Sequence, residues 1–193
     1  MTPMIAIDLK GKAMTLRGDD NPVSAALRAA LAANGATLGD HAEPDMLILS
    51  FPLLPGEGID VEPLLAQAER AGAAMARRGH GRILCLVSAM AGMPMRRHPD
   101  YSRRMANVLT TVRTLAMRLG PHVLVNAVGV GAIGEPLVAG DAAMLGHASV
   151  KRPGTVAEVV DAALFFADPL NTYTTGQMLS VDGGWSAGYG RNF

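Results

Sequence analysis

Apolar residues recur at helical spacing over residues 101–119 and run almost without interruption in the segments on either side. The residues at that spacing share one face of the predicted helix: Tyr101, Met105, Val108, Leu109, Val112, Leu115, Ala116 and Leu119. The flanking segments, RILCLVS and HVLVNAV, are short and largely apolar, which is typical of strands covered on both faces. A strand, a helix and a second strand in this order predict a crossover unit within a parallel sheet.

The first part of the chain shows the same alternation, punctuated by capping residues. Residues 12–16 predict a strand. The helix that follows has Asn21 as its N-cap, Pro22 at its first position and Gly35 after its end. The run MLILS, Met46–Ser50, predicts a second buried strand.

Two further helices and a last strand complete the pattern. A helix over residues 61–78 opens with an acidic residue and a proline, and it ends in two arginines that suit the negative end of its dipole. A later helix opens with a capping box of Thr155 and Glu158, and QMLSVDGG then predicts the final buried strand. Strands that alternate with helices in this way indicate one α/β domain over residues 1–193, built on a parallel sheet.

Composition excludes several classes of function. The formal net charge is zero, so nothing favours nucleic acid or an anionic membrane as a partner. No apolar run has the length of a membrane span, and the first residues lack the layout of a signal peptide, so we expect a cytoplasmic protein.

The single cysteine, Cys85, lies in a predicted buried strand, where packing is its expected role. Neither Glu62 nor Glu135 has neighbours that indicate a metal site.

Four segments carry the motifs of one known family. GRILCLVSAMAG is similar to that family's serine-bearing strand, YSRRM to its Tyr-x-x-x-Lys motif, and VLVNAVGVGAIG to the strand before its substrate loop. The segment from KRPGT to DGGWSAG is similar to its C-terminal signature. Over roughly residues 11–188 the chain thus resembles the short-chain dehydrogenase/reductase family. The resemblance implies a Rossmann-like, doubly wound parallel sheet and, in the family, an NAD(P)-dependent oxidoreductase.

The cofactor loop departs from the family pattern. In the family the turn after the first strand reads Thr-Gly-x-x-x-Gly-x-Gly and binds the dinucleotide pyrophosphate at a helix N-terminus. Here Gly18 remains, but Pro22 and Ser24 stand where the second and third glycines would be. Proline lacks an N–H donor, and the carboxylates of Asp19 and Asp20 repel a pyrophosphate. We therefore expect only a vestige of this loop and no bound cofactor.

The connection after the first helix is also short. About ten residues separate Gly35 from Met46–Ser50, whereas a crossover with its helix takes roughly thirty. We therefore expect a Rossmann-like sheet shortened by loss of strands 2–3 of the dinucleotide half, which hold the adenine and select the ribose substituent. The family's Asn-Asn-Ala-Gly has no match either, because residues 49–52 read LSFP.

The catalytic positions that the resemblance implies are only partly filled. The family uses a tyrosine as general acid and base, a lysine that lowers the tyrosine pKa, a serine that polarises the substrate and an asparagine in a proton relay. Tyr101 is present, but Met105 stands at the lysine position, and Arg104 lies on a different face of the helix.

The serine position has two alignments. Counting back from Tyr101 gives Ser88, whereas matching SAMAG to the family's Ser-Ser-x-x-Gly gives Ala89 and places Glu62 at the asparagine position. The second alignment is slightly favoured because IDVE resembles the family's Asp-Val-Asn.

These losses together predict a catalytically degenerate family member that acts as a scaffold subunit. By the resemblance, residues 61–78 and 101–119 form the interface of a homodimer or tetramer, alone or together with an active homologous reductase. Two alternatives are a redox-neutral enzyme that uses Tyr101, as halohydrin dehalogenases of this fold do, and an oxidoreductase that retains NAD(P). Fold alone does not decide among them.

Overall fold

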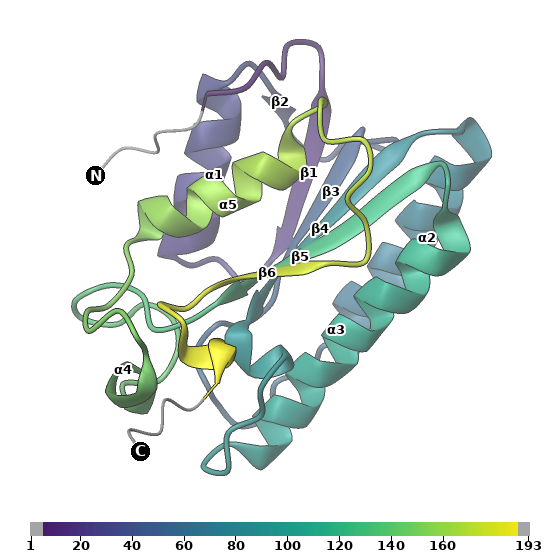
Figure 1. Cartoon of the computed structure of the whole chain (residues 1–193). Helices are drawn as coiled ribbons and strands as arrows, with labels where there is room; N and C mark the ends of the chain where they lie inside the picture. Colours follow the sequence, from purple (N-terminus) through teal and green to yellow (C-terminus); the bar gives the residue numbers. More distant parts are fainter. Residues whose placement is uncertain (1–5, 189–193) are drawn as a thin grey trace.

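The computed structural model describes residues 6–188, and its strands form one parallel sheet (Figure 1). The strands are β1 (Ala13–Gly18), β2 (Thr37–Leu38), β3 (Met46–Ser50), β4 (Gly81–Ser88), β5 (Val123–Val130) and β6 (Met178–Val181). They lie in the order β2-β1-β3-β4-β5-β6, and every pairing is parallel. This sheet confirms the predicted α/β, Rossmann-like class.

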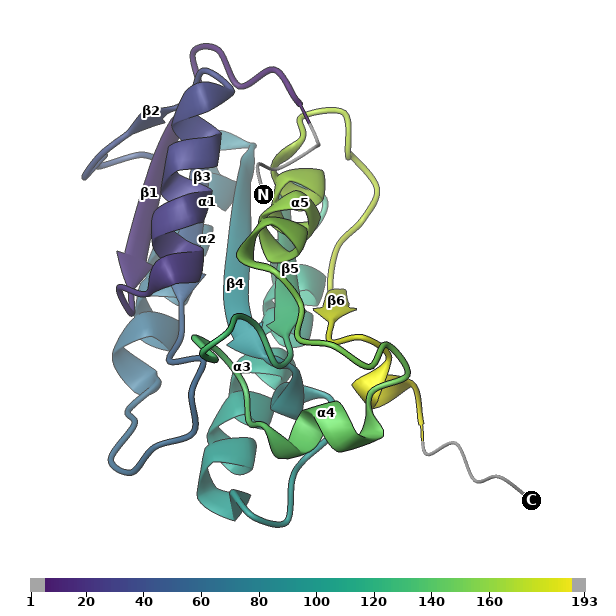
Figure 2. The ribbon, with the colours of Figure 1, turned by 90° about the vertical axis from the view of Figure 1, so that its left-hand side faces the viewer.

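Helices cover both faces of the sheet. α1 (Pro22–Ala33) and α5 (Val156–Ala167) lie side by side on one face, as Figures 1 and 2 show. α2 (Glu62–Arg78) and α3 (Pro99–Leu119) pack together on the other face. A short helix, α4 (Ala143–His147), follows β5. The doubly wound arrangement therefore buries the strands from both sides.

The core follows the period of two along the central strands. Odd-numbered residues of β3 and β4 pack with α2 and α3, and they are Leu47, Leu49, Ile83, Cys85 and Val87. Even-numbered residues pack with α1 and α5, and they are Met46, Ile48, Leu84 and Leu86. Burial raises the pKa of the Cys85 thiol to about 12, which makes this cysteine a packing group rather than a nucleophile.

Helix patterning and capping agree with the sequence. Every residue of the predicted apolar stripe of α3 is buried, and that helix ends at Leu119 as expected. It begins at Pro99 rather than Tyr101 because proline is favoured in a first turn. Asn21 caps α1, and Thr155 with Glu158 forms the capping box of α5, so both predicted N-termini are confirmed.

Two short elements were not predicted. β2 consists of Thr37–Leu38 and pairs with the start of β1, and residues 39–45 then lead to β3 without a helix. α4 lies within a segment that the sequence predicts as loop. Neither element is long enough to show a hydrophobic period, so local pattern could not reveal them.

Candidate functional site

Tyr101 lies where the carboxyl ends of the central strands meet the first turn of α3. Its side chain is only 3% exposed. The hydroxyl donates a hydrogen bond to the backbone carbonyl oxygen of Pro52, 2.7 Å away in the segment after β3. The phenol proton is therefore held by the protein's own backbone.

The structure brings Ser88 to Tyr101. Ser88 is the last residue of β4 and is fully buried, and its hydroxyl lies close enough to the Tyr101 phenol to lower the pKa of that phenol. The Ser88 oxygen also accepts a bond from the backbone N–H of Met90, which starts the short 3₁₀ turn after β4. Ala89 is buried in that turn and has no polar group to offer. Of the two alignments, the one that counts back from Tyr101 places a hydroxyl beside the phenol.

The surroundings of Tyr101 hold its pKa high. Burial raises the pKa of the phenol well above its ordinary value of 10.0; the hydrogen bond with Ser88 lowers it, and the carboxylate of Asp19 raises it further. Among the described residues, no positively charged side chain acts on the pKa of Tyr101. A phenol in this environment stays protonated at neutral pH.

The position four residues after Tyr101 faces the core. The Met105 side chain is fully buried in the cluster formed by α2, α3 and the sheet. Arg104 precedes it in α3 and is exposed, on the side of the helix that faces solvent. Neither residue therefore supplies a cation to the buried phenol.

Glu62, the residue aligned with the family's relay asparagine, engages a different helix. It is the first residue of α2 and is exposed. Its carboxylate accepts a hydrogen bond of 3.0 Å from the side-chain amide of Asn107 in α3. The structure thus uses Glu62 to join α2 to α3 and does not bring it to Tyr101 by a hydrogen bond.

The turn after β1 begins with a glycine that packing requires. Gly18 has φ +104°, in the left-handed region. A Cβ atom at this position would lie 2.1 Å from the backbone oxygen of Ser50 in β3. The backbone N–H of Asp19 bonds to that same oxygen at 2.7 Å. The close contact of β1 with β3 therefore requires a glycine here even without a ligand.

The N-terminus of α1 is satisfied by its own cap. The side-chain oxygen of Asn21 accepts bonds from the backbone N–H groups of Val23 and Ser24, both at 3.0 Å. The hydroxyl of Ser24, fully buried, accepts the backbone N–H of Asn21 in return. Pro22 carries no N–H at the first helical position. The donors that a helix N-terminus offers to an anion are thus bonded to the cap.

A histidine–aspartate contact that no sequence motif indicates joins two loops near this edge. Nε2 of His98, before α3, lies 2.6 Å from Oδ2 of Asp141 in the loop after β5. Burial raises the pKa of Asp141, but hydrogen bonds from His98 and the Ala143 N–H, with the charge of Arg97, bring the pKa below its ordinary value. The two residues are 43 positions apart, and no local motif signals such a contact.

Metal-ligating and membrane-spanning features are absent from residues 6–188. No group of three or more His, Cys, Asp or Glu side chains gathers there in a way that could hold a metal ion. None of the helices in that range combines the length and the apolar character needed to cross a bilayer.

A parallel sheet covered on both faces, with a serine and a tyrosine meeting at its carboxyl edge, defines a Rossmann-like α/β protein. Residues 58–186 match the family model described as enoyl-(acyl carrier protein) reductase, which covers about two thirds of the chain. The chain therefore belongs to the short-chain dehydrogenase/reductase family, as its motifs predict.

Curated relatives of the chain carry oxidoreductase names. The short-chain reductase protein NovJ of Streptomyces niveus is 35% identical over 126 residues, which cover 58% of this chain and 48% of that protein. The glucose 1-dehydrogenase of Gluconobacter oxydans is 37% identical over 112 residues, covering 54% of this chain and 42% of that protein. The match thus spans about half the length of these relatives.

Solved structures show the same fold. A structure from Agrobacterium tumefaciens with bound NADP, described as a candidate 2-deoxy-D-gluconate 3-dehydrogenase, has a TM-score of 0.80 at 20% identity, covering 94% of this chain and 98% of that one. A short-chain dehydrogenase/reductase from Mycobacterium ulcerans has a TM-score of 0.73 at 18% identity, covering 97% and 94%. At this identity the likeness concerns the fold alone.

Proposed function

We propose that this chain is a catalytically degenerate family member that no longer binds NAD(P) and serves as a non-catalytic scaffold subunit in a homo- or hetero-oligomer. The observation that carries the proposal is the state of Tyr101. Its hydroxyl donates to the Pro52 carbonyl, its side chain is buried, and Asp19 is the charge that acts on it. A general acid and base needs a pKa near the working pH and a proton within reach of substrate.

The fit of a dinucleotide supports the same proposal. The first N–H groups of α1 would have to bind the pyrophosphate, but the Asn21 side chain already accepts from two of them. Asp19 and Asp20 place carboxylates at the same turn. Met105 offers no donor for a ribose hydroxyl. The residues present do not fit a dinucleotide bound in the family's manner.

The proposed assembly uses the outer faces of α2 and α3. These helices pack side by side with their apolar stripes against the sheet, so their other faces are available to a second chain. The outer face of α3 includes Met117, whose side chain is 78% exposed. An exposed apolar residue on a helix that pairs subunits in the family supports a dimer or a tetramer here.

Dinucleotide binding is the first test. We would record thermal melts of the full chain with millimolar NADH and NADPH, beside an NADP-binding family member as positive control. A ligand at a hundred times its dissociation constant adds about 2.7 kcal/mol, which raises the midpoint by roughly 2–4 °C in a domain of this size. We expect no shift for this chain. A shift comparable to that of the control would overturn the proposal and favour a dinucleotide-dependent oxidoreductase, as the relatives are named.

Light scattering of the purified chain tests the assembly. We expect the mass of a dimer or tetramer, unchanged in Tyr101→Phe, because a scaffold needs the helix faces and not the phenol. Arg113→Glu, on the outer face of α3, should shift the mass toward monomer, whereas Arg28→Glu on α1 should not. A monomer at every concentration, with no partner chain bound, would contradict the scaffold role.

The redox-neutral alternative has one favourable observation, the contact between Ser88 and Tyr101. It needs the phenol to meet a substrate, which requires the bond to Pro52 to open. Turnover that is lost in Tyr101→Phe and indifferent to NADH and NADPH would support this alternative over the scaffold.

A further inference from the structure

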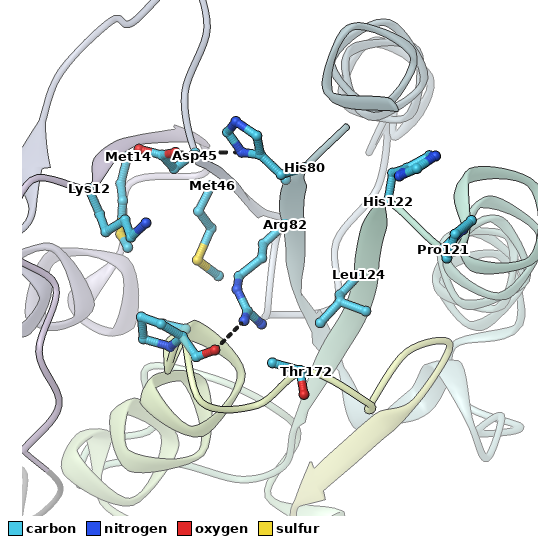
Figure 3. A pocket seen from close by; sticks show the side chains of 13 residues that line it. Lys12, Met14, Asp45, Met46, His80, Arg82, Pro121, His122, Leu124 and Thr172 are labelled. Atoms are coloured by element: carbon cyan, nitrogen blue, oxygen red, sulfur yellow. Dashed lines mark hydrogen bonds and ion pairs between the residues drawn. The ribbon is translucent and has the colours of Figure 1, made fainter. Parts of the chain in front are cut away.

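The opposite edge of the sheet carries a cavity that the family motifs do not involve. It has a volume of about 340 Å³ and lies at the amino ends of β1, β3, β4 and β5 (Figure 3). The connections that precede β4, β5 and β6 complete its wall. In open α/β sheets ligands normally bind at the carboxyl ends of the strands, so this cavity is separate from the site around Tyr101. Its size lies at the lower end of the range for small-molecule pockets.

Arg82 is the half-buried cation of this cavity. It lies near the start of β4 and is half-buried, and its guanidinium donates to two backbone carbonyl oxygens, those of Phe166 at 3.4 Å and Pro169 at 3.2 Å. Burial lowers the pKa of Arg82, and the charge of Asp168 partly offsets that effect. Burying a cation is unfavourable unless it is paired, and two long bonds to neutral carbonyls are weak compensation. The remaining N–H donors of the guanidinium can bind an anion.

Lys12 provides a second cation across the cavity. Within residues 6–188 its amino group has no hydrogen bond or ion pair, although its side chain is only partly exposed. Figure 3 shows Lys12 and Arg82 on either side of Met46, whose side chain extends between them. Leu124 adds a further apolar surface beside Arg82. The cavity thus combines two cations with an apolar wall.

The acidic residue of the cavity is already engaged. Oδ2 of Asp45 accepts the backbone N–H of Ala13 at 2.9 Å, and Oδ1 lies 3.8 Å from Nδ1 of His80, the contact drawn as a dashed line at the top of Figure 3. Asp168, which acts on Arg82 from beyond the wall, accepts the backbone N–H of Leu170. Within residues 6–188 neither carboxylate forms a hydrogen bond or an ion pair with Lys12 or Arg82, so both cations keep N–H donors for a ligand.

We propose that this cavity binds the oxyanion group, phosphate or carboxylate, of a small organic molecule. Arg82 and Lys12 bind the oxygens, Thr172 lines the same side, and Met46 and Leu124 contact the apolar part. The cavity is too small for a dinucleotide, so it does not stand in for the family's cofactor site. The proposal holds whether or not the carboxyl edge is catalytic.

NMR titration of the isotope-labelled full chain tests the proposal. The probes are phenyl phosphate, benzoate and, as a neutral control of similar shape, benzyl alcohol. We expect saturable shifts of the amides of Gly81, Arg82 and Leu124 with one or both anions and none with benzyl alcohol. Tighter binding of phenyl phosphate assigns the site to phosphate esters, and tighter binding of benzoate assigns it to carboxylates. Both results support an oxyanion site.

Substitutions of the two cations test which residues bind the anion. Lys12→Gln and Arg82→Gln should each weaken binding by about tenfold or more, because each removes a charge-assisted hydrogen bond. Arg28→Gln, which removes an exposed positive charge on α1, should leave affinity unchanged. Lys12→Gln keeps the test valid if Arg82→Gln fails to fold, since the lysine amino group has no partner to lose within residues 6–188. Equal weakening in Arg28→Gln, no saturation, or shifts confined to the first turn of α1 would overturn the proposal.

Discussion

The two edges of the sheet differ in how their polar groups are satisfied. At the carboxyl edge the phenol of Tyr101, the first N–H groups of α1 and the carboxylate of Glu158 all bond to groups of the same chain. At the amino edge Lys12 has no partner among the described residues, and Arg82 bonds only to neutral carbonyls. At the edge that carries the family's motifs these three groups are satisfied within the chain, and the edge without motifs keeps unused donors on Lys12 and Arg82. Whether an edge can bind a ligand depends on which hydrogen-bond donors remain unpaired there, and not on where a sequence motif lies.

The largest effect should come from restoring the family's lysine at the carboxyl edge. Met105→Lys places a cation in the buried cluster between α2, α3 and the sheet, whose members among the described residues are hydrophobic. We expect a loss of about 3–5 kcal/mol in the free energy of unfolding, measured by urea denaturation. Ala29→Lys, at an exposed position of α1, is the matched control and should change stability by less than about 0.5 kcal/mol.

A small loss of unfolding free energy in Met105→Lys would contradict the difference between the two edges of the sheet. It would mean that the lysine amine reaches solvent or an unfilled space beside Tyr101, so that this edge still has room for a ligand. Binding of NADH by that variant would make the same point more directly.

The next effect concerns the cap of α1. Asn21→Ala removes the oxygen that accepts from Val23 and Ser24, and it should cost about 1–2 kcal/mol of stability by urea denaturation. Asp20→Ala, one residue earlier and exposed, should cost less than about 0.5 kcal/mol. Equal losses of stability in the two variants would indicate that the charge of the turn contributes more to stability than the hydrogen bonds of the Asn21 cap.

The smallest effect depends on pH and concerns the N-terminus of α5. Hydrogen bonds from Arg152 and from the backbone N–H of Thr155 lower the pKa of Glu158 to about 2, from an ordinary value of 4.5. Because the folded-state pKa is lowered, the stabilisation is present above about pH 4.5 and is lost as the pH falls toward 2. The pair is partly exposed, so we expect Glu158→Gln to cost less than about 1 kcal/mol at pH 7.

Urea denaturation between pH 7 and pH 3 checks this dependence. The cost of Glu158→Gln should shrink across that range, whereas Glu57→Gln, which removes an exposed carboxylate from a loop, should show no such trend. A pH-independent cost would mean that the side chain acts only through its shape and its neutral hydrogen bonds.

The sequence predicted the fold well because the fold depends on periodic burial. The stripe of α3, the continuous runs of β3 and β4, and the caps Asn21 and Thr155 each have a local signal, and the structure contains all of them. β2 and α4 are too short to produce such a signal. Their existence depends on tertiary contacts, such as the pairing of Thr37 with Ala13.

The surroundings of the candidate site were harder to predict. Tyr101 and Met105 could be located from a motif, and their burial follows from the stripe. The acceptor of the Tyr101 hydroxyl is a backbone oxygen of Pro52, which no side-chain pattern can reveal. The cavity with Lys12 and Arg82 joins segments that only the folded sheet brings together. The cavity residues in these segments follow no sequence spacing that would mark a binding site.

The retained glycine of the cofactor loop bears on how such chains are classified. Because a side chain at position 18 would collide with the backbone oxygen of Ser50, the neighbouring strand alone selects glycine there. Packing alone can therefore account for a glycine at this position, whether or not a ligand binds there. A glycine that follows the first strand is therefore not by itself a mark of nucleotide binding. The second and third positions of the motif, here Pro22 and Ser24, are the informative ones.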